Sequence, residues 1–360
     1  MKLLTLFSVF ALATVVTAFL FITTMTNDVD PKEEIFAMPK EKSFDETLTK
    51  THTAFTALHP YPKDFEKTRK LLASKLGAKN IKNGLLIQPS IYIKKYGRLG
   101  NNILQLSNTI YLAEVMNVST IYIEKNYCYI KEPFITSKGI RIIPTDKKLN
   151  ESYVLGEFGY NMYVEDYCPE NRVYEFAGET LKNLPQVKTE DDSLYIHIRS
   201  GDAFVRHCPY LGQPPACFYE GIIEKWGFKN VYILCENTKN PVIPYLVKRY
   251  DAKLLIIDLK ETVSIILDAK NLVVSFGTFI PSVLKLTPED PKKRIFRYGD
   301  KFYFARIFWK KFYFTDVSDN YYNALLNINW KNTPEQREMM FNETCGDEWK
   351  ISMYTEYSQT

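Results

Sequence analysis

The sequence has little histidine and almost no net charge. Its four histidines, His52, His59, His197 and His207, are scattered over 360 residues, which nearly excludes a histidine-rich metal site. The 46 lysines and arginines against 42 aspartates and glutamates leave a net charge of +4, too small for a dedicated nucleic-acid-binding protein. With 46% hydrophobic and 24% charged residues, the chain is of ordinary globular composition, which excludes disordered, collagen-like and coiled-coil classes.

Several familiar ligand-binding motifs are also missing. No Walker loop, no GxGxxG and no CxxC spacing occurs. The only Asp-x-Asp triplet is 28–30, and the adjacent pair Asp191 and Asp192 fits a solvated turn before a strand. We therefore expect no metal and no tightly bound cofactor.

The N-terminus carries one long uncharged segment. Residues 3–27 are long enough to cross the hydrocarbon core of a bilayer, with Lys2 before them and Asp28 after them. We expect an uncleaved signal anchor with the rest of the chain in the lumen, that is, a single-pass type II membrane protein of the secretory pathway. The small-residue triplet 16–18 keeps a cleaved signal peptide, and hence secretion, open as the alternative.

Glycosylation sequons and cysteines agree with a lumenal chain. Asn117, Asn150 and Asn342 each begin a sequon. The six cysteines permit up to three disulfides, whose pairing the sequence does not determine. Cys208 and Cys217 flank a loop containing glycine and proline and are the best local candidates. Cys235 lies in an apolar run and fits a buried free thiol.

Apolar strands alternate with helical segments from about residue 85 onward. Strands are expected at 120–124 and 153–155, and the helix after the first strand is expected to have Ile103, Leu106, Ile110 and Ala113 on one face. This alternation predicts an α/β fold with mostly parallel sheets covered on both faces. Two such halves on one chain predict two Rossmann-like domains with a cleft between them. The stretch 302–314 is rich in aromatic residues and is expected to be a strand with alternate side chains inside, a membrane- or sugar-contacting role being the alternative. The expected segments are a cytosolic tip (1–2), the anchor (3–27), a lumenal stem (28–80), an N-terminal domain (81–190), a C-terminal domain (191–300) and an extension packing back on them (301–360).

Two glycine-containing motifs follow predicted strands. The first includes Gly97, Arg98, Gly100 and Asn101, where a tight turn precedes a helix whose N-terminus offers free N–H groups. A plain strand–helix turn is the alternative there. Ligands of parallel sheets bind at the carboxyl ends of strands, which is where this motif is expected to lie.

The second motif is HIRSGD at 197–202. His197 and Arg199 alternate at the end of an apolar strand, and an arginine there needs an anionic partner, such as a diphosphate. Asp202 is placed to orient either residue or to hold a substrate hydroxyl. A purely structural Arg199–Asp202 ion pair is the alternative.

These motifs resemble those of fucosyltransferases that use GDP-fucose. GRLGNNILQLSNT (97–109) resembles the GRxGNQ segment of the α1,2-fucosyltransferase family, glycosyltransferase family 11, and HIRSGD resembles the HxRRxD motif of the wider superfamily. The segment 275–279, SFGTF, lies where that family has a loop after a strand. The resemblance covers roughly residues 85–300, with the motifs in the same order.

The resemblance implies a GT-B fold and an inverting, metal-independent transfer of fucose from GDP-fucose to a glycan, on a glycoprotein or glycolipid. It makes 81–190 the acceptor-side domain and 191–300 the donor-binding domain and, together with the anchor, implies a Golgi membrane protein. It implies that Arg199 holds the donor diphosphate, with His197 supporting and Asp202 orienting the site. The donor-contacting residues that it implies are Gly97, Arg98, Gly100, Asn101, Ser275, Gly277 and Thr278. The acceptor's base is not identified, and Asp202 and His207 are candidates by their place in the chain.

Three positions depart from the family pattern. Ser200 stands where the family has a second arginine, Asn102 where it has glutamine, and Ile280-Pro281-Ser282 where it continues with a tryptophan-containing segment. The chain therefore resembles a divergent member. Two alternatives stay open: a glycosyltransferase that uses another nucleotide sugar, and an inactive relative that binds glycans or nucleotide sugars.

Overall fold

The structure is a computed structural model, and its described part belongs to one compact unit, Tyr61–Thr360. That part forms an α/β fold with two mostly parallel sheets, which confirms the predicted fold class at this level. The predicted anchor (3–27) and stem (28–80) lie outside it. Among the described helices, none combines the length and apolar character needed to cross a membrane. The described residues are 81–82, 85–86, 90–95, 97–115, 117–146, 153–155, 172–204, 212–298, 311–326 and 330–353.

The first sheet has the strand order β5-β6-β4-β3-β7. Strands β3, β4, β6 and β7 are parallel, and β5 joins β6 in the antiparallel direction. A short hairpin of β1 (Ile81–Lys82) and β2 (Leu85–Leu86) precedes the sheet. The elements of this half are β3 (Ser90–Ile93), α4 (Leu99–Val115), β4 (Thr120–Glu124), the 3-10 turn η1 (Tyr127–Tyr129), β5 (Phe134–Ile135), β6 (Arg141–Thr145), β7 (Tyr153–Leu155) and α5 (Tyr174–Leu181).

Helix α4 packs through the face that its sequence period predicts. Ile103, Leu106, Ile110 and Ala113 recur at helical spacing, and all four are fully buried. Full burial of each isoleucine or leucine side chain stabilises the fold by roughly 1.5–3 kcal/mol. The packing of this face fixes where the N-terminus of α4, which carries the first motif, can lie.

The second sheet has the order β10-β9-β8-β11-β12-β13-β14, parallel except for β14. It confirms the predicted alternation of strands and helices between residues 193 and 284. Its elements are β8 (Ser193–His197), η3 (Gly201–Phe204), α6 (Ala216–Trp226), β9 (Asn230–Leu234), α7 (Val242–Tyr250), β10 (Lys253–Leu255), α8 (Leu259–Asp268), β11 (Asn271–Val274), α9 (Phe279–Leu284), β12 (Arg294–Arg297), β13 (Lys311–Thr315), α10 (Asp319–Tyr321), the π-helical turn η5 (Tyr322–Leu326), α11 (Pro334–Asn342) and β14 (Trp349–Met353).

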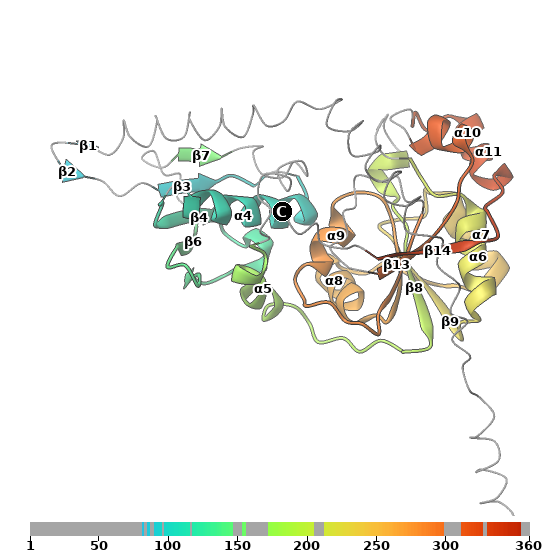
Figure 1. Cartoon of the computed structure of the whole chain (residues 1–360), viewed down its shortest axis with the longest axis horizontal. Coiled ribbons are helices and arrows are strands. Elements are labelled where there is room, and N and C mark those ends of the chain that lie inside the picture. Colours follow the sequence, from blue (N-terminus) through green and yellow to red (C-terminus); the bar gives the residue numbers. More distant parts are fainter. Residues whose placement is uncertain are drawn as a thin grey trace, which may run out of the picture. The chain divides into compact units, whose positions relative to one another are not determined.

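Helices cover both faces of this second sheet (Figure 1). Helices α6 and α7 pack on one face, and α8 and α9 on the other. Alternate residues of β8 follow this division, because Leu194 and Ile196 join one hydrophobic cluster and Tyr195 joins the other. The cluster under α8 and α9 also contains the core of the first sheet, so the two sheets share buried contacts within one unit.

The C-terminal region completes the second sheet, so the predicted boundary at residue 300 cuts across that sheet. Strands β13 and β14 both lie within the predicted extension 301–360. In β13, Phe312 and Phe314 are buried, as expected of a strand with alternate side chains inside. The position of β14 follows from packing that no local pattern reveals, since Trp349 contacts the rings of Trp226 and Phe296.

The predicted disulfide between Cys208 and Cys217 is wrong. Cys217, in the first turn of α6, is bonded to Cys345, 128 residues later, with a Cα–Cα distance of 5.7 Å. Trp349 of β14 packs against Phe218 of α6, so the chain before β14 lies close to Cys217, and proximity in sequence misleads about the partner. Cys235 is a buried free thiol, as predicted, and so is Cys128.

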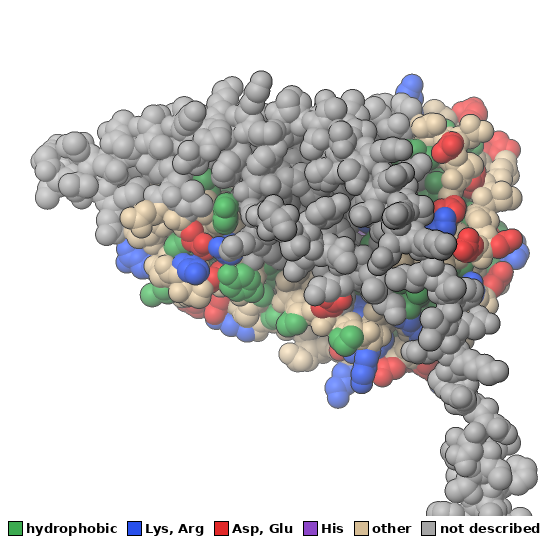
Figure 2. Space-filling view, viewed as in Figure 1, with side chains coloured by type: hydrophobic (Ala, Val, Ile, Leu, Met, Phe, Trp, Pro, Cys, Tyr) green, Lys and Arg blue, Asp and Glu red, His purple; other side chains and the backbone are tan. Residues whose placement is uncertain are grey.

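Charged side chains of both signs are interspersed on the coloured surface in Figure 2. No large patch of one sign is visible among the described residues on that face. The distribution agrees with the small net charge of the chain, +4.

Candidate functional site

The three predicted motif segments follow strands at points where the strand order reverses. In the second sheet the chain passes from β8 outward to β9 and β10, and then returns to β11 on the other side of β8. In the first sheet β4 and β6 lie on one side of β3, and β7 lies on the other. Segments 97–102, 197–202 and 275–279 end or follow β3, β8 and β11. Such reversal points are where open α/β sheets bind ligands.

The segment after β3 packs tightly against the start of α9. Gly97 turns the chain with a φ of +69°, and α4 begins two residues later. A Cβ atom at Gly100 would lie 2.7 Å from the backbone of Phe279, so any larger residue would force the two segments apart. Beside this contact, the Thr278 hydroxyl donates a 2.5 Å hydrogen bond to the side-chain oxygen of Asn101. Motif segments far apart in the chain thus meet directly.

His197, at the end of β8, is linked to the segment after β11. Its Nδ1 lies 2.5 Å from the hydroxyl oxygen of Ser275, and its ring centroid lies 5.4 Å from that of Phe279. Burial, with a smaller effect of the Arg199 charge, lowers the pKa of His197 to about 3. The ring is therefore neutral near pH 7, when it can hold Ser275 in place but is a poor proton acceptor.

Arg199 lies between an acidic partner and a glycine. Its Nη2 is 3.1 Å from one carboxylate oxygen of Asp202 and 3.3 Å from the other. Gly277, with a φ of +107°, lies against Nη1, and any side chain there would collide with the guanidinium group. The Nε atom is buried and has no hydrogen-bond partner among the described residues. The side chain keeps 23% of its surface exposed, which leaves it accessible to an anion.

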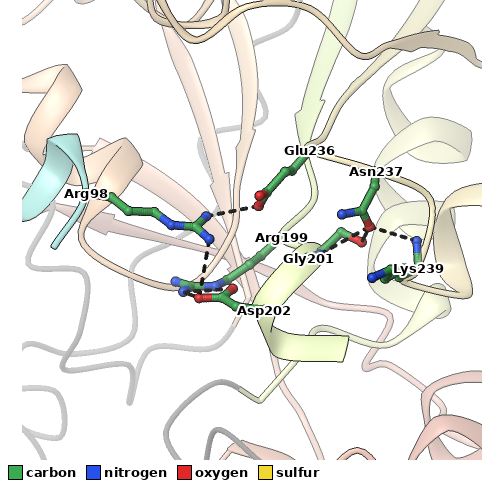
Figure 3. Close-up of polar contacts among 8 residues, drawn as sticks. Arg98, Arg199, Gly201, Asp202, Glu236, Asn237 and Lys239 are labelled. Atoms are coloured by element: carbon green, nitrogen blue, oxygen red, sulfur yellow. Dashed lines mark hydrogen bonds and ion pairs between the residues drawn. The ribbon is translucent and has the colours of Figure 1, made fainter. Parts of the chain in front are cut away.

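Arg98 brings a second guanidinium group to the same place (Figure 3). Its Nη1 donates a 3.0 Å hydrogen bond to Glu236, and its Nη2 lies 3.7 Å from Asp202. Burial raises the pKa of Asp202, but the charge and hydrogen bonds of Arg199, together with the charge of Arg98, lower it overall. The four side chains therefore form a row in which arginines and carboxylates alternate, in the order Arg199, Asp202, Arg98 and Glu236.

Ser200 has a different role from the arginine that the family pattern has there. It is 2% exposed, donates a 2.7 Å hydrogen bond to Asn237, and accepts one of 3.0 Å from the backbone N–H of Asn240. The side chain of Asn240 in turn donates to the backbone oxygen of Arg199. An arginine would not fit this enclosed position without leaving it, so serine suits the local packing of this chain.

Sequence reasoning missed the polar segment after β9, which contains Glu236, Asn237 and Asn240. The signal was present, since this segment follows an apolar strand in the same way as the HIRSGD motif. The rule that ligand-binding residues follow parallel strands applies to it equally.

The remaining predicted residues lie away from this cluster or outside the described part. Asn117 and Asn342 are exposed, which sequon use requires. Asn150, His207 and Cys208 lie outside the described residues.

Comparisons with known proteins give little guidance. No protein-family model and no curated protein sequence matches this chain. Among solved structures, E. coli heptosyltransferase WaaC with ADP is similar to it at a TM-score of 0.31 and 10% sequence identity. That match covers 58% of this chain and 86% of the other. At this level of similarity we draw no functional conclusion from it.

Proposed function

We propose that this protein is a glycosyltransferase of the GT-B type that transfers a sugar from a nucleotide-sugar donor to a hydroxyl group of a glycan. We propose GDP-fucose as the donor and an inverting, metal-independent reaction. Through residues 3–27 the chain would be held as a type II protein in the Golgi membrane, with its catalytic part in the lumen.

The observation that carries the proposal is the meeting of Arg98 and Arg199 at the reversal points of both sheets. Cleavage of a nucleotide sugar leaves a nucleoside diphosphate, whose negative charge grows in the transition state. Guanidinium groups bind such oxygens bidentately and stabilise that charge. Removing one such donor typically slows a reaction by about a hundredfold to a thousandfold.

The other residues of the cluster suit positioning roles. Asp202 is ionised and paired with Arg199, so it orients that guanidinium group. Its lowered pKa makes it a weak base for the acceptor hydroxyl. His197 contacts Ser275, and Thr278 of the same segment donates a hydrogen bond to Asn101. Together these contacts fix the segment after β11 between the other two motifs. In this proposal departure of the diphosphate dominates the barrier, and deprotonation of the acceptor contributes less.

The absence of a second arginine at position 200 favours two other candidates, a transferase for another nucleotide sugar and an inactive binder. With Ser200 in place of the family's second arginine, the HIRSGD motif supplies one guanidinium group, and Arg98 is the other cation of the described cluster. Donor selection therefore needs a direct measurement.

The test measures thermal unfolding of the full-length protein, in mild detergent, with GDP, UDP, ADP and CMP, with and without a chelator. A ligand at about 100 times its Kd stabilises a protein by about 2.7 kcal/mol. We expect GDP to raise the Tm with or without chelator, and Arg199→Ala to abolish the shift. Arg249→Ala is the matched control, because Arg249 is also ion-paired but lies on α7, at Glu220 and Glu224.

The outcomes separate the candidates. Stabilisation by UDP or CMP instead of GDP would select another donor. GDP binding without release of GDP from GDP-fucose in the presence of glycan acceptors would indicate an inactive binder. No nucleotide response from folded protein would refute the proposed function.

A further inference from the structure

Glu236 accepts a hydrogen bond from Arg98 much as Asp202 does from Arg199, but it is the more exposed carboxylate of the cluster, at 54% against 28%. It follows β9, the strand beside β8, and the two strands pair in register at His197 and Leu234. Glu236 therefore lies level with the segment that carries Arg199. Figure 3 shows its carboxylate directed towards Arg98 and away from the side chain of Asn237.

The backbone around Glu236 is held in place by the neighbouring loop. The side-chain oxygen of Asn237 accepts hydrogen bonds from the Ser200 hydroxyl, from the Gly201 N–H at 3.3 Å and from the Lys239 N–H at 3.1 Å. Gly201 has a φ of +59°, and a Cβ atom there would collide with the Glu236 carboxylate. The loop thus leaves space for the acidic group to approach its backbone.

The carboxylate of Glu236 has acceptor capacity to spare. Its side chain is 54% exposed, and from the described residues it accepts one hydrogen bond, at Oε2, from Arg98. An ionised carboxylate has about four acceptor sites. It repels phosphate oxygens, so its complement in a ligand is a group with O–H or N–H donors, such as a vicinal diol.

We propose that Glu236 binds the ribose hydroxyls of the nucleotide and so selects ribonucleotide donors; this inference rests on the proposed function. One guanidinium group, that of Arg98, separates Glu236 from Asp202, which holds Arg199. In a nucleotide sugar the ribose follows the diphosphate directly. Acidic side chains after the second strand of a dinucleotide-binding sheet hold a ribose in the same way.

The experiment compares binding of GDP and 2′,3′-dideoxy-GDP to the full-length protein by calorimetry. Hydrogen bonds to a charged group are strong enough that wild type should bind GDP at least about ten times more tightly than the dideoxy nucleotide. In Glu236→Gln the ratio should fall to about twofold or less, because glutamine keeps the size but loses the charge. Glu224→Gln is the matched control, with a side chain 58% exposed and ion-paired on α6, and should keep the wild-type ratio.

Several results would overturn the inference while GDP still stabilises wild type and not Arg199→Ala. Equal binding of the two nucleotides by wild type is one, and an unchanged ratio in Glu236→Gln is another. A Glu236→Gln effect confined to the ratio between GDP and IDP would assign the residue to the base instead. An effect seen with GDP-fucose but not with GDP would assign it to the transferred sugar. Absence of any nucleotide binding by wild type would instead refute the proposed function itself.

Discussion

Replacing Gly100 by alanine should destabilise the protein, although alanine is the better helix former. A Cβ atom at this position would lie 2.7 Å from the Cα and N atoms of Phe279 and from the carbonyl carbon of Thr278. All three are backbone atoms at the start of α9, so no side-chain rotation relieves the contact. The starts of α4 and α9 would have to separate by at least about 0.7 Å to reach an ordinary contact of 3.4 Å.

The expected size follows from two opposed effects. Overpacking of this kind typically costs about 1–3 kcal/mol. The intrinsic preference for alanine over glycine returns at most about 1 kcal/mol, and less in the first turn of a helix. We therefore expect Gly100→Ala to lower the free energy of unfolding by about 1–2 kcal/mol.

Gly178→Ala is the control for this prediction. Gly178 lies inside α5, and a Cβ atom there would meet no atom within 4 Å. The same chemical change should therefore stabilise the protein by about 0.4–1 kcal/mol. Urea unfolding of both variants measures the two free energies, and the signs should be opposite.

Pushing the starts of α4 and α9 apart should also weaken nucleotide binding at the site. The hydrogen bond between Thr278 and Asn101 lies beside the Gly100 contact and would lengthen as the helices separate. GDP should then stabilise Gly100→Ala less than wild type. A Gly100→Ala variant within about 0.5 kcal/mol of wild type, well below the expected overpacking cost, would show that α4 and α9 do not approach as described.

Three further predictions concern the disulfide, Ser200 and His197. Peptide mapping without reduction should find Cys217 linked to Cys345, and Cys345→Ser should cost about 2–5 kcal/mol of stability; a peptide joining Cys217 to Cys208 would contradict this. Ser200→Arg should lower the Tm and leave GDP affinity no higher, because the position is enclosed; a stable variant with tighter GDP binding would refute that reasoning. The pKa of His197 falls from 6.5 to about 3 on folding, so between these pH values the unfolded chain binds a proton that the folded protein does not. This residue therefore costs the protein no stability above pH 6.5 and lowers the free energy of unfolding as the pH falls towards 3. The free energy of unfolding should therefore decrease less steeply between pH 6.5 and 4 in His197→Gln than in wild type, and equal slopes would count against the burial of that ring.

Local patterns in the sequence determined the secondary structure around the site. Strand β4 and strand β7 have the predicted bounds, and the buried face of α4 is the predicted one. Both follow from periods of two and 3.6 residues, which act over a few neighbours in the chain. The positions of the motifs after strands could be predicted for the same reason.

Long-range packing decided which residues meet at the site. The hydrogen bond from Arg98 to Glu236 spans 138 residues, and that from Thr278 to Asn101 spans 177. No local period encodes such a pair, because its partners are brought together by the order of strands in two sheets. The pairing of Cys217 with Cys345 and the burial of Ser200 against Asn237 and Asn240 also depend on contacts between segments far apart in the chain. The sequence by itself therefore determined the strands and helices next to the motifs and the kinds of residue at their ends. Only the tertiary structure decided that Glu236 joins them, since a strand's neighbours in a sheet are set by the packing of the whole chain.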